Sequence, residues 1–356
     1  MKIAFLNIYN GVIDRGAETF VKELAQRLSN RHDVFVLQGG EEQDFEKYKV
    51  VKVPIKFDWN KKSGVSTLTA FLFLDYWNRL IAIFALKSIP IIWREKFDVV
   101  VPVNGGWLPA IMRLITWLYG GKMVISGQSG IGWDDRNNLW CFPNIFVALS
   151  TKAKDWAKRV NPLARIEYIP NGVDISKFSP VGKKRKFSLE RPIILCVAAL
   201  TPSKRVELAI ESVMKLEKGS LLVVGDGDSR DKIYNLGKKL LGERFQLIKV
   251  PYERMPEVYR SADVFTIPSQ SFYSFEIVLV EAMATNLPVV ANDDPIRREI
   301  VGEAGILVDP TDTKAYARAL EEALRTNWTN KPRKQAEKFS WDTIAEKYEK
   351  LFKDLS

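Results

Sequence analysis

Short apolar runs that alternate with amphipathic stretches constrain the fold of this chain more than any other feature. The run KIAFLNI at 2–8 precedes a helical period at 16–31, which leads into a second apolar run, DVFVLQGG. The same order recurs later, where PIILCVAAL at 192–200 precedes RVELAIESVMKL and then SLLVVGDG. Strands that are apolar throughout are typical of parallel sheets covered by helices on both faces. The sequence therefore predicts an α/β protein with two doubly wound sheets.

Length and a local change of composition indicate two domains. At 356 residues the chain is long for a single hydrophobic core. Between the two series of strands lies IPNGVDISKFSPVGKKRKFSLERP, which has the proline, glycine, serine and charge of a linker. We expect a Rossmann-like N-terminal domain at 1–172, a linker at 173–192 and a second Rossmann-like domain at 193–339. An amphipathic helix at 340–356 is expected to return to the N-terminal domain.

Charge and the scarce metal-binding residues narrow the class of partner. The chain has 53 basic and 43 acidic residues, a net charge of +10, which favours nucleotide phosphates, an acidic membrane surface or nucleic acid. The basic run 183–186 falls in the linker, so we expect a solvated segment and no nucleic-acid partner. One histidine, His32, and two distant cysteines, Cys141 and Cys196, cannot build a typical zinc module. Buried thiols and an apolar start too short for a signal peptide predict a cytoplasmic protein.

One segment is more apolar and aromatic than the rest. Residues 67–93 read TLTAFLFLDYWNRLIAIFALKSIPIIW. Three charged residues interrupt this segment and Pro90 is expected to break it, so it does not fit a membrane-spanning helix of roughly 20 apolar residues. Two interpretations stay open, namely helices buried in the first domain, which we favour, or an apolar surface that meets lipid or a lipid-linked substrate.

Three loops follow predicted strands and lead into helices, where phosphates bind in doubly wound folds. The first, YNGVIDRGAETF, contains Gly16, which would let the backbone approach a ligand or would simply form a turn. The second places Lys204 and Arg205 at a helix start, where cations are unfavourable unless an anion binds. The third, VVGDGDSR, contains Asp226 and Gly227. Its two aspartates, Asp226 and Asp228, are similar to the metal-binding carboxylate pair of metal-dependent sugar transferases, although a glycine turn explains the motif equally well.

Taken together, these segments resemble the retaining glycosyltransferases of family 4. RGAETFVKELAQRLSNRHDVFVL is similar to the opening helix and second strand of that family, and NIFVALSTKAKDWAKR with IEYIPNGVDISKF to the segment that enters the linker. YERMPEVYRSADVFTIPS and VEAMATNLPVVANDDPIRREIVGEAGILVDPTDTKAYARAL are the most specific matches. The resemblance covers nearly the whole chain. It implies the GT-B fold, two facing Rossmann-like domains with an acceptor side, a nucleotide-sugar side and the active site between them.

The resemblance also implies roles for individual residues. Glu281 matches the glutamate that holds the ribose hydroxyls of the nucleotide, and Lys204 matches the lysine on the donor diphosphate. Gly16 matches the second glycine of the family's Gly-Gly loop. Asp226 and Gly227 fall in the glycine-rich loop at a strand end, with no role specified.

Several positions depart from the family pattern. Tyr273 stands where the family carries the first of its two glutamates, and Glu276 where a glycine commonly follows phenylalanine. Ala199 replaces an arginine before the lysine, a charge that Arg205 would restore. Arg15 replaces the first glycine of the Gly-Gly loop, and Gln128 lies near the position of a missing N-domain histidine. The predicted donor site therefore contains Tyr273, Glu276 and the two residues that follow it, Ile277 and Val278, while the contacts to the sugar are altered.

Glu276 and Glu281 stand five apart in an apolar run. In an ideal helix this spacing separates two side chains by roughly 140°, so we expect different roles. Glu281 would hold the ribose from within a helix. Glu276 would lie in or just before the first turn and touch the transferred sugar, the alternative being a capping carboxylate with no ligand.

The resemblance implies a retaining transfer from a nucleoside diphosphate sugar to a glycan or lipid-linked acceptor by front-face displacement. Lys204, Arg205 and backbone amides would stabilise the leaving diphosphate in place of a metal, and no cofactor is expected. Closure between the domains would exclude water. The alternatives are a non-catalytic nucleotide-sugar-binding partner subunit and, further off, a nucleotide-sugar epimerase. The net charge and the aromatic segment at 67–93 also suggest peripheral contact with an anionic membrane. The sequence identifies neither the donor nor the acceptor.

Overall fold

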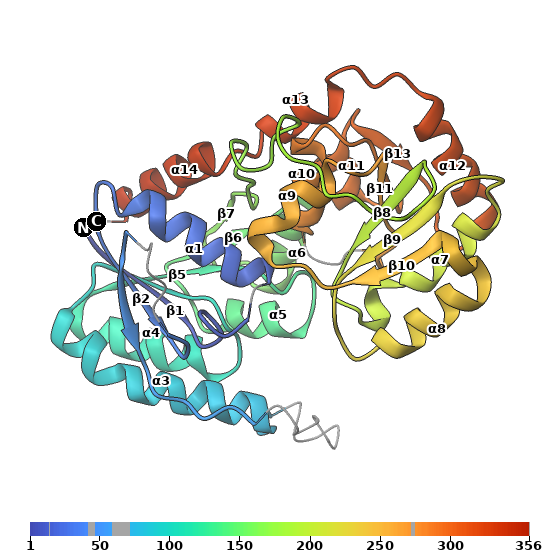
Figure 1. Ribbon diagram of the computed structural model, residues 1–356. Helices are drawn as coiled ribbons and strands as arrows, with labels where there is room; N and C mark the ends of the chain where they lie inside the picture. Colours follow the sequence, from blue (N-terminus) through green and yellow to red (C-terminus); the bar gives the residue numbers. More distant parts are fainter. Residues whose placement is uncertain (14, 42–46, 59–71, 272–274, 356) are drawn as a thin grey trace. The chain divides into compact units, whose positions relative to one another are not determined.

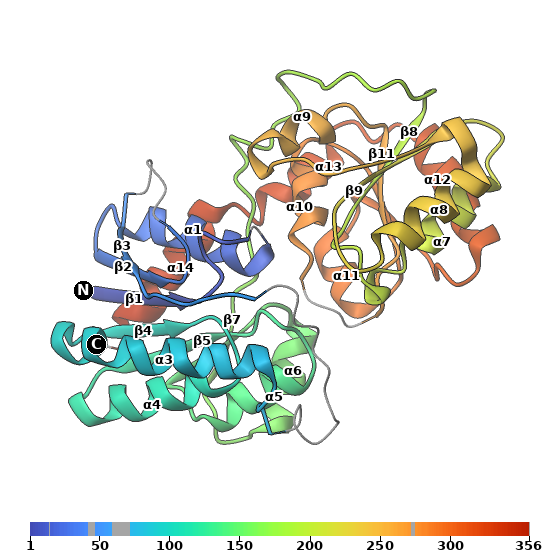
Figure 2. The same cartoon turned by 60° about the horizontal axis from the view of Figure 1, so that its bottom comes forward.

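The computed structural model describes residues 1–13, 15–41, 47–58, 72–271 and 275–355. The chain forms two compact units. Unit 1 comprises Met1–Asn171 together with Asp342–Ser356, and unit 2 comprises Gly172–Trp341. Each unit is built on one parallel sheet, and Figures 1 and 2 show each sheet with helices on both of its faces. This is the doubly wound α/β architecture that the sequence predicts.

The described residues of unit 1 form a seven-stranded sheet in the order β3-β2-β1-β4-β5-β6-β7. The strands are β1 (Lys2–Asn7), β2 (Asp33–Gln38), β3 (Lys49–Lys52), β4 (Val99–Pro102), β5 (Lys122–Ser126), β6 (Ile145–Ala148) and β7 (Ile166–Tyr168). The helices are α1 (Gly16–Leu28), α3 (Tyr76–Glu95), α4 (Trp107–Tyr119), α5 (Trp133–Trp140), α6 (Thr151–Val160) and α14 (Trp341–Lys353).

Strand β1 lies in the interior of the sheet, with both of its edges paired. Ile3 pairs with Val34 of β2 on one side and with Val99 of β4 on the other. Ile3 to Leu6 are fully buried, as expected for a strand covered on both faces. Helix α1 buries an apolar stripe that includes Phe20, and the ring of Phe20 packs edge-on against Phe5.

The described residues of unit 2 form a six-stranded parallel sheet in the order β10-β9-β8-β11-β12-β13. The strands are β8 (Ile193–Val197), β9 (Ser220–Val224), β10 (Phe245–Ile248), β11 (Val264–Ile267), β12 (Val289–Ala291) and β13 (Gly305–Leu307). The helices are η1 (Pro202–Lys204), α7 (Val206–Met214), α8 (Arg230–Leu241), η2 (Gly242–Arg244), η3 (Tyr252–Arg254), α9 (Met255–Tyr259), α10 (Ile277–Ala284), α11 (Pro295–Val301), α12 (Thr313–Arg325) and α13 (Lys331–Glu337).

The segment 173–192 belongs to unit 2 and is hydrogen-bonded within it. The Ser261 hydroxyl and the Arg260 guanidinium, both just after α9, donate to the carbonyls of Arg185 and Lys183. The backbone N–H of Arg185 donates in turn to the carbonyl of Glu257. The basic run therefore lies along the end of α9.

Helix α3 continues through Pro90, contrary to the expected break. Asp75 caps the helix by accepting from the backbone N–H groups of Trp77 and Asn78. Proline removes one backbone hydrogen bond, but Phe84 and Ile92 on either side are fully buried in the unit 1 core. Tertiary packing on one face therefore offsets the lost hydrogen bond, and the helix continues past the proline.

The C-terminal helix α14 is part of unit 1 and lies along α1 (Figures 1 and 2). The Tyr348 ring packs edge-on against Phe20 of α1, and its hydroxyl lies 3.1 Å from the hydroxyl of Ser126 at the end of β5. Ion pairs join Arg27 to Asp342 and Arg31 to Glu349 at the rim. Unit 1 is thus completed by a segment more than 170 positions away in the sequence from the rest of its core.

Candidate functional site

In unit 2, loops that follow four neighbouring strands meet at one edge of the sheet. Lys204 follows β8, Gly227 follows β9, Ser269 follows β11 and Asp294 follows β12, and these strands are adjacent in the order β9-β8-β11-β12. Because all four strands are parallel, these loops lie at the carboxyl edge, where doubly wound sheets bind ligands. This edge is the candidate site.

Lys204 and Glu276 form its centre. The Lys204 ammonium donates to Glu276 Oε1 at 2.7 Å, although the two residues are 72 positions apart. Lys204 ends η1, and Glu276 immediately precedes α10. Both residues are buried in the structure, the Lys204 side chain being 11% exposed and that of Glu276 1%. Of the residues proposed from the sequence, these two are joined directly.

A buried arginine completes an ionic network around Glu276. Arg297, in α11, ion-pairs with Glu276 and lies 3.2 Å from Asp294, and its side chain is fully buried. The Ser269 hydroxyl donates a further hydrogen bond to Glu276. Burial raises the pKa of Glu276, but the charges of Arg297 and Lys204 and the hydrogen bonds from Lys204 and Ser269 outweigh it and lower that pKa to about 2. Glu276 is therefore a carboxylate across the physiological range.

Sequence reasoning missed Arg297, Ser269 and Asp294. The segment DDPIRREI was part of the family resemblance, yet nothing in it distinguishes Arg297 from the exposed Arg298 beside it. Pro295 marks the start of α11, but it does not indicate which of the two arginines is buried, because burial depends on how α11 packs in the folded unit.

The backbone of Glu276 is unusual. Its φ is +58°, in the left-handed region that favours glycine, and its side chain makes no capping hydrogen bond to α10. The expected position just before the first helical turn is confirmed, and the side chain does not cap α10, while its contact with the transferred sugar stays a prediction. Ile277 and Val278 follow as the first two residues of α10. Tyr273, which the sequence places in the donor site, lies outside the described residues.

Glu281 lies in the middle of α10 in a different environment. Its Oε2 accepts a hydrogen bond of 2.7 Å from the Tyr259 hydroxyl at the end of α9. Burial raises the pKa of Tyr259 well above its ordinary value, and the Glu281 charge adds to this rise. Glu276 therefore faces cations and Glu281 faces a neutral hydroxyl, so the two glutamates differ in environment, and their different roles stay a prediction.

Arg205 supports the loop after β11. Its φ is +47°, and its guanidinium donates to the backbone carbonyls of Pro268 and Ser269 at 2.8 and 2.7 Å. These bonds hold the hydroxyl of Ser269 near Glu276. In this structure the Arg205 charge is thus directed to the protein backbone, and its predicted contact with the diphosphate stays a prediction.

Gly227 allows the loop after β9 to approach the loop after β8. A Cβ at Gly227 would lie 2.7 Å from the carbonyl oxygen of Leu200, and φ is +150°. Asp226 ion-pairs with Lys249 at 3.0 Å, and its carbonyl accepts from the Leu200 N–H. The described residues hold no group of three or more candidate metal ligands. The close approach at Gly227 and the contacts of Asp226 give this motif a structural role, and its predicted place in the donor site stays a prediction.

Gly16 belongs to unit 1, where it is the first residue of α1 and follows Arg15. The nearby Glu18 is buried and accepts a hydrogen bond of 3.2 Å from Asn7 at the end of β1. Burial raises the pKa of Glu18. Gln128, also in unit 1, exchanges hydrogen bonds with the side chain of Asn171.

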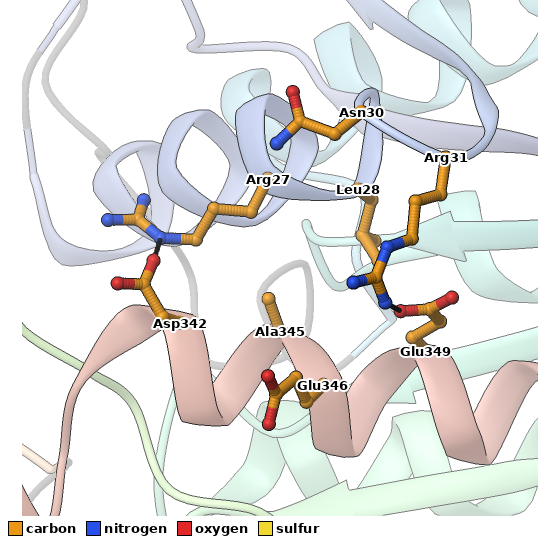
Figure 3. A pocket seen from close by; sticks show the side chains of 8 residues that line it. All are labelled: Arg27, Leu28, Asn30, Arg31, Asp342, Ala345, Glu346 and Glu349. Carbon is orange, nitrogen blue, oxygen red and sulfur yellow. Dashed lines mark hydrogen bonds and ion pairs between the residues drawn. The ribbon is translucent and has the colours of Figure 1, made fainter.

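A pocket of about 150 Å³ lies elsewhere in unit 1, between α1 and α14 (Figure 3). The Arg27–Asp342 and Arg31–Glu349 pairs stand at its two ends, and Glu346 points away from α1 (Figure 3). Because these two ion pairs stand at its ends and it lies in unit 1, this pocket is a packing feature of unit 1 and is not part of the candidate site in unit 2.

Each unit is a parallel sheet covered by helices on both faces, and two such Rossmann-like units fit the GT-B fold. Two family models match in succession, Glycosyltransferase Family 4 over residues 15–177 and Glycosyl transferases group 1 over residues 181–349. The chain belongs to this glycosyltransferase family, as its motifs indicate.

Individual relatives are distant. An exopolysaccharide phosphotransferase of Streptomyces coelicolor is 30% identical over 60% of this chain and 23% of its own length. A phosphatidyl-myo-inositol mannosyltransferase of Mycolicibacterium smegmatis is 29% identical over 59% of this chain and 57% of its own. The chain thus spans about half the length of the mannosyltransferase and less of the phosphotransferase. HepE of Anabaena, solved with UDP-glucose, superposes with a TM-score of 0.77 at 16% identity, over 99% of this chain and 100% of HepE, which shows the shared fold.

Proposed function

We propose that this protein transfers a glycosyl group from a nucleoside diphosphate sugar to an acceptor and retains the anomeric configuration. The observation that carries the proposal is the hydrogen bond from Lys204 to Glu276, the residue just before α10, at the carboxyl edge of the unit 2 sheet. The match of Lys204 to the family's diphosphate-binding lysine supports this proposal, in which the donor diphosphate lies beside Lys204. Relatives support the donor class, since a phosphatidylinositol mannoside mannosyltransferase is named as GDP-mannose-dependent and HepE binds UDP-glucose.

In the proposed reaction the bond between the anomeric carbon and the diphosphate oxygen breaks while the acceptor oxygen bonds to the same face of that carbon. The acceptor proton passes to the departing diphosphate. Lys204 stabilises the charge that develops on the leaving group, and no metal takes part. Glu281, oriented by Tyr259, holds the ribose hydroxyls.

We also propose that the acceptor is a glycan or a lipid-linked molecule and that the protein meets an anionic membrane from the cytoplasmic side. The exposed face of α3 supports this. It carries apolar and basic side chains and no exposed acid, namely Arg79, Ile83, Leu86, Lys87, Pro90, Trp93 and Arg94. Helix α4 packs beside α3 (Figure 2) and adds Leu114, Trp117 and Leu118, each more than half exposed. Among the described helices, none has the length and apolarity needed to cross a bilayer.

The test has two stages. A thermal-shift screen against nucleoside diphosphate sugars finds the donor, because a ligand bound only by the folded state raises the melting temperature. Release of nucleoside diphosphate in the presence of glycan or lipid-linked acceptors then tests transfer. Tight donor binding without turnover on any acceptor would favour a non-catalytic partner subunit, and donor interconversion without acceptor would indicate an epimerase.

A further inference from the structure

Glu276 is costly to the fold in two ways. Its φ is +58°, a conformation that is strained for a residue other than glycine. The side chain is also a fully buried carboxylate, which must be matched by buried cations. Strain and buried charge at one residue beside a binding edge point to a function of the carboxylate.

The charges in the network cancel. Lys204 and Arg297 contribute two positive charges, and Glu276 and Asp294 contribute two negative ones. Arg297 is fully buried, whereas the Lys204 side chain keeps 11% of its surface exposed. Lys204 is therefore the cation in this network that an incoming anion reaches, and Glu276 already occupies it.

We propose that the Glu276 carboxylate is an internal anion that holds the diphosphate position on Lys204 until a nucleoside diphosphate displaces it. This rests on the proposed function, since it assigns Lys204 to the donor diphosphate. Displacement leaves no bare carboxylate, because Arg297 and Ser269 continue to bind Glu276 when Lys204 turns to the phosphate. The Lys204 ammonium group has three donors, so it stays hydrogen-bonded to an anion when it turns from the carboxylate to the phosphate.

The internal anion also makes the site selective. A nucleoside diphosphate contacts the protein through its base and ribose, and these contacts offset the energy of separating Lys204 from Glu276. Pyrophosphate and inorganic phosphate lack such contacts and compete with the carboxylate on charge alone. The site therefore rejects free inorganic phosphates while it admits the nucleotide, and Glu276 determines this specificity.

Calorimetric titration of the full chain tests the proposal. The first probe is a nucleoside diphosphate, chosen from UDP, GDP and ADP as the one that binds the wild type. The second probe is inorganic pyrophosphate, and all titrations are made at constant ionic strength. Glu276→Gln removes the charge and keeps the shape. Glu322→Gln, at an exposed position of α12, makes the same change in net charge away from the site. We expect Glu276→Gln to bind both probes more tightly, on the order of tenfold, with pyrophosphate gaining more. Glu322→Gln should match the wild type.

Lys204 is then removed in the same background. If the gain in affinity comes from freeing Lys204, it disappears in the double variant Lys204→Ala/Glu276→Gln. A purely structural effect of Glu276 would leave the gain in place when Lys204 is absent. Glu276→Asp serves if the glutamine variant fails to fold, because it keeps the buried charge, accepts positive φ more readily and draws the carboxylate back from Lys204. A smaller gain is expected there.

The outcomes separate the two proposals. Unchanged or weaker binding of both probes by the folded Glu276 variants overturns the internal anion and leaves the proposed function standing, provided that the wild type binds a nucleotide. Absence of nucleotide binding in every variant overturns the proposed function. The pyrophosphate titration then still decides whether Glu276 blocks Lys204.

Discussion

At the scale of single residues, Lys204 offers the most direct test of the donor site. Lys204→Ala should weaken nucleoside diphosphate binding by about 1–3 kcal/mol and leave the free nucleoside unaffected, because hydrogen bonds from a cation to phosphate are the strong ones. The fold should survive, since Glu276 keeps Arg297 and Ser269. Calorimetry on Lys239→Ala, an exposed lysine of α8, provides the matched control. Equal weakening of nucleoside and nucleoside diphosphate would contradict the assignment of Lys204.

Glu281 should act on the other end of the nucleotide. Glu281→Gln is expected to weaken the nucleoside and the nucleoside diphosphate alike, by on the order of 1–3 kcal/mol, since the ribose is common to both. Tyr259→Phe removes the hydroxyl that orients Glu281 and should produce a smaller loss of about 1 kcal/mol. If Glu281→Gln affected only the diphosphate form, the ribose role would be excluded.

The sequence identified these residues only in part, for a physical reason. Lys204 and Glu281 stand in local motifs, so a single stretch of chain carries their signal. Arg297 has a role only because α11 brings it against Glu276, a contact 21 positions away that no local pattern encodes. The positive φ of Glu276 was equally hidden, because its side chain is atypical for that backbone conformation.

At the scale of elements, apolar runs predicted the buried parallel strands well. A strand that is buried on both faces is apolar throughout and lacks the alternation of polar and apolar residues found in half-buried strands. Helix α3 was less predictable. Its charged residues and Pro90 lie on the exposed face with Ile83, Leu86 and Trp93, so they interrupt the apolar sequence without interrupting the helix. In its described part, one face of α3 is buried in the unit 1 core, as the favoured interpretation predicts, while contact of the exposed face with lipid stays a proposal.

The exposed face of α3 gives a prediction about membranes. Replacing Leu86 and Trp93, 56% and 47% exposed, with glutamine should reduce sedimentation with phosphatidylglycerol vesicles several-fold, because apolar insertion and basic attraction act together. Leu163→Gln, at an 83% exposed site outside α3 and α4, should have no effect. Vesicles of neutral phosphatidylcholine should bind less of the wild type. Absence of binding to anionic vesicles at low salt would refute the membrane contact.

At the scale of the whole molecule, the two units differ in how they are built from the chain. Unit 2 is one continuous segment, whereas unit 1 needs Asp342–Ser356 to cover α1 and the end of β5. Tyr348 is central to that cover, since its ring packs on Phe20 and its hydroxyl meets Ser126. The stability of unit 1 therefore depends on residues at the far end of the sequence.

Tyr348→Ala in the full chain should destabilise unit 1 by about 3–5 kcal/mol, the usual cost of deleting a buried aromatic side chain. Tyr348→Phe, which loses only the hydroxyl, should cost about 1 kcal/mol. Hydrogen exchange resolved by segment checks both variants, because local opening is reported separately for each unit. Protection should fall in β1, β5 and α1 and stay unchanged in β8 and β9. Equal loss of protection in both units would show that they unfold as one cooperative body, and the division of the chain would then describe its geometry but not its stability.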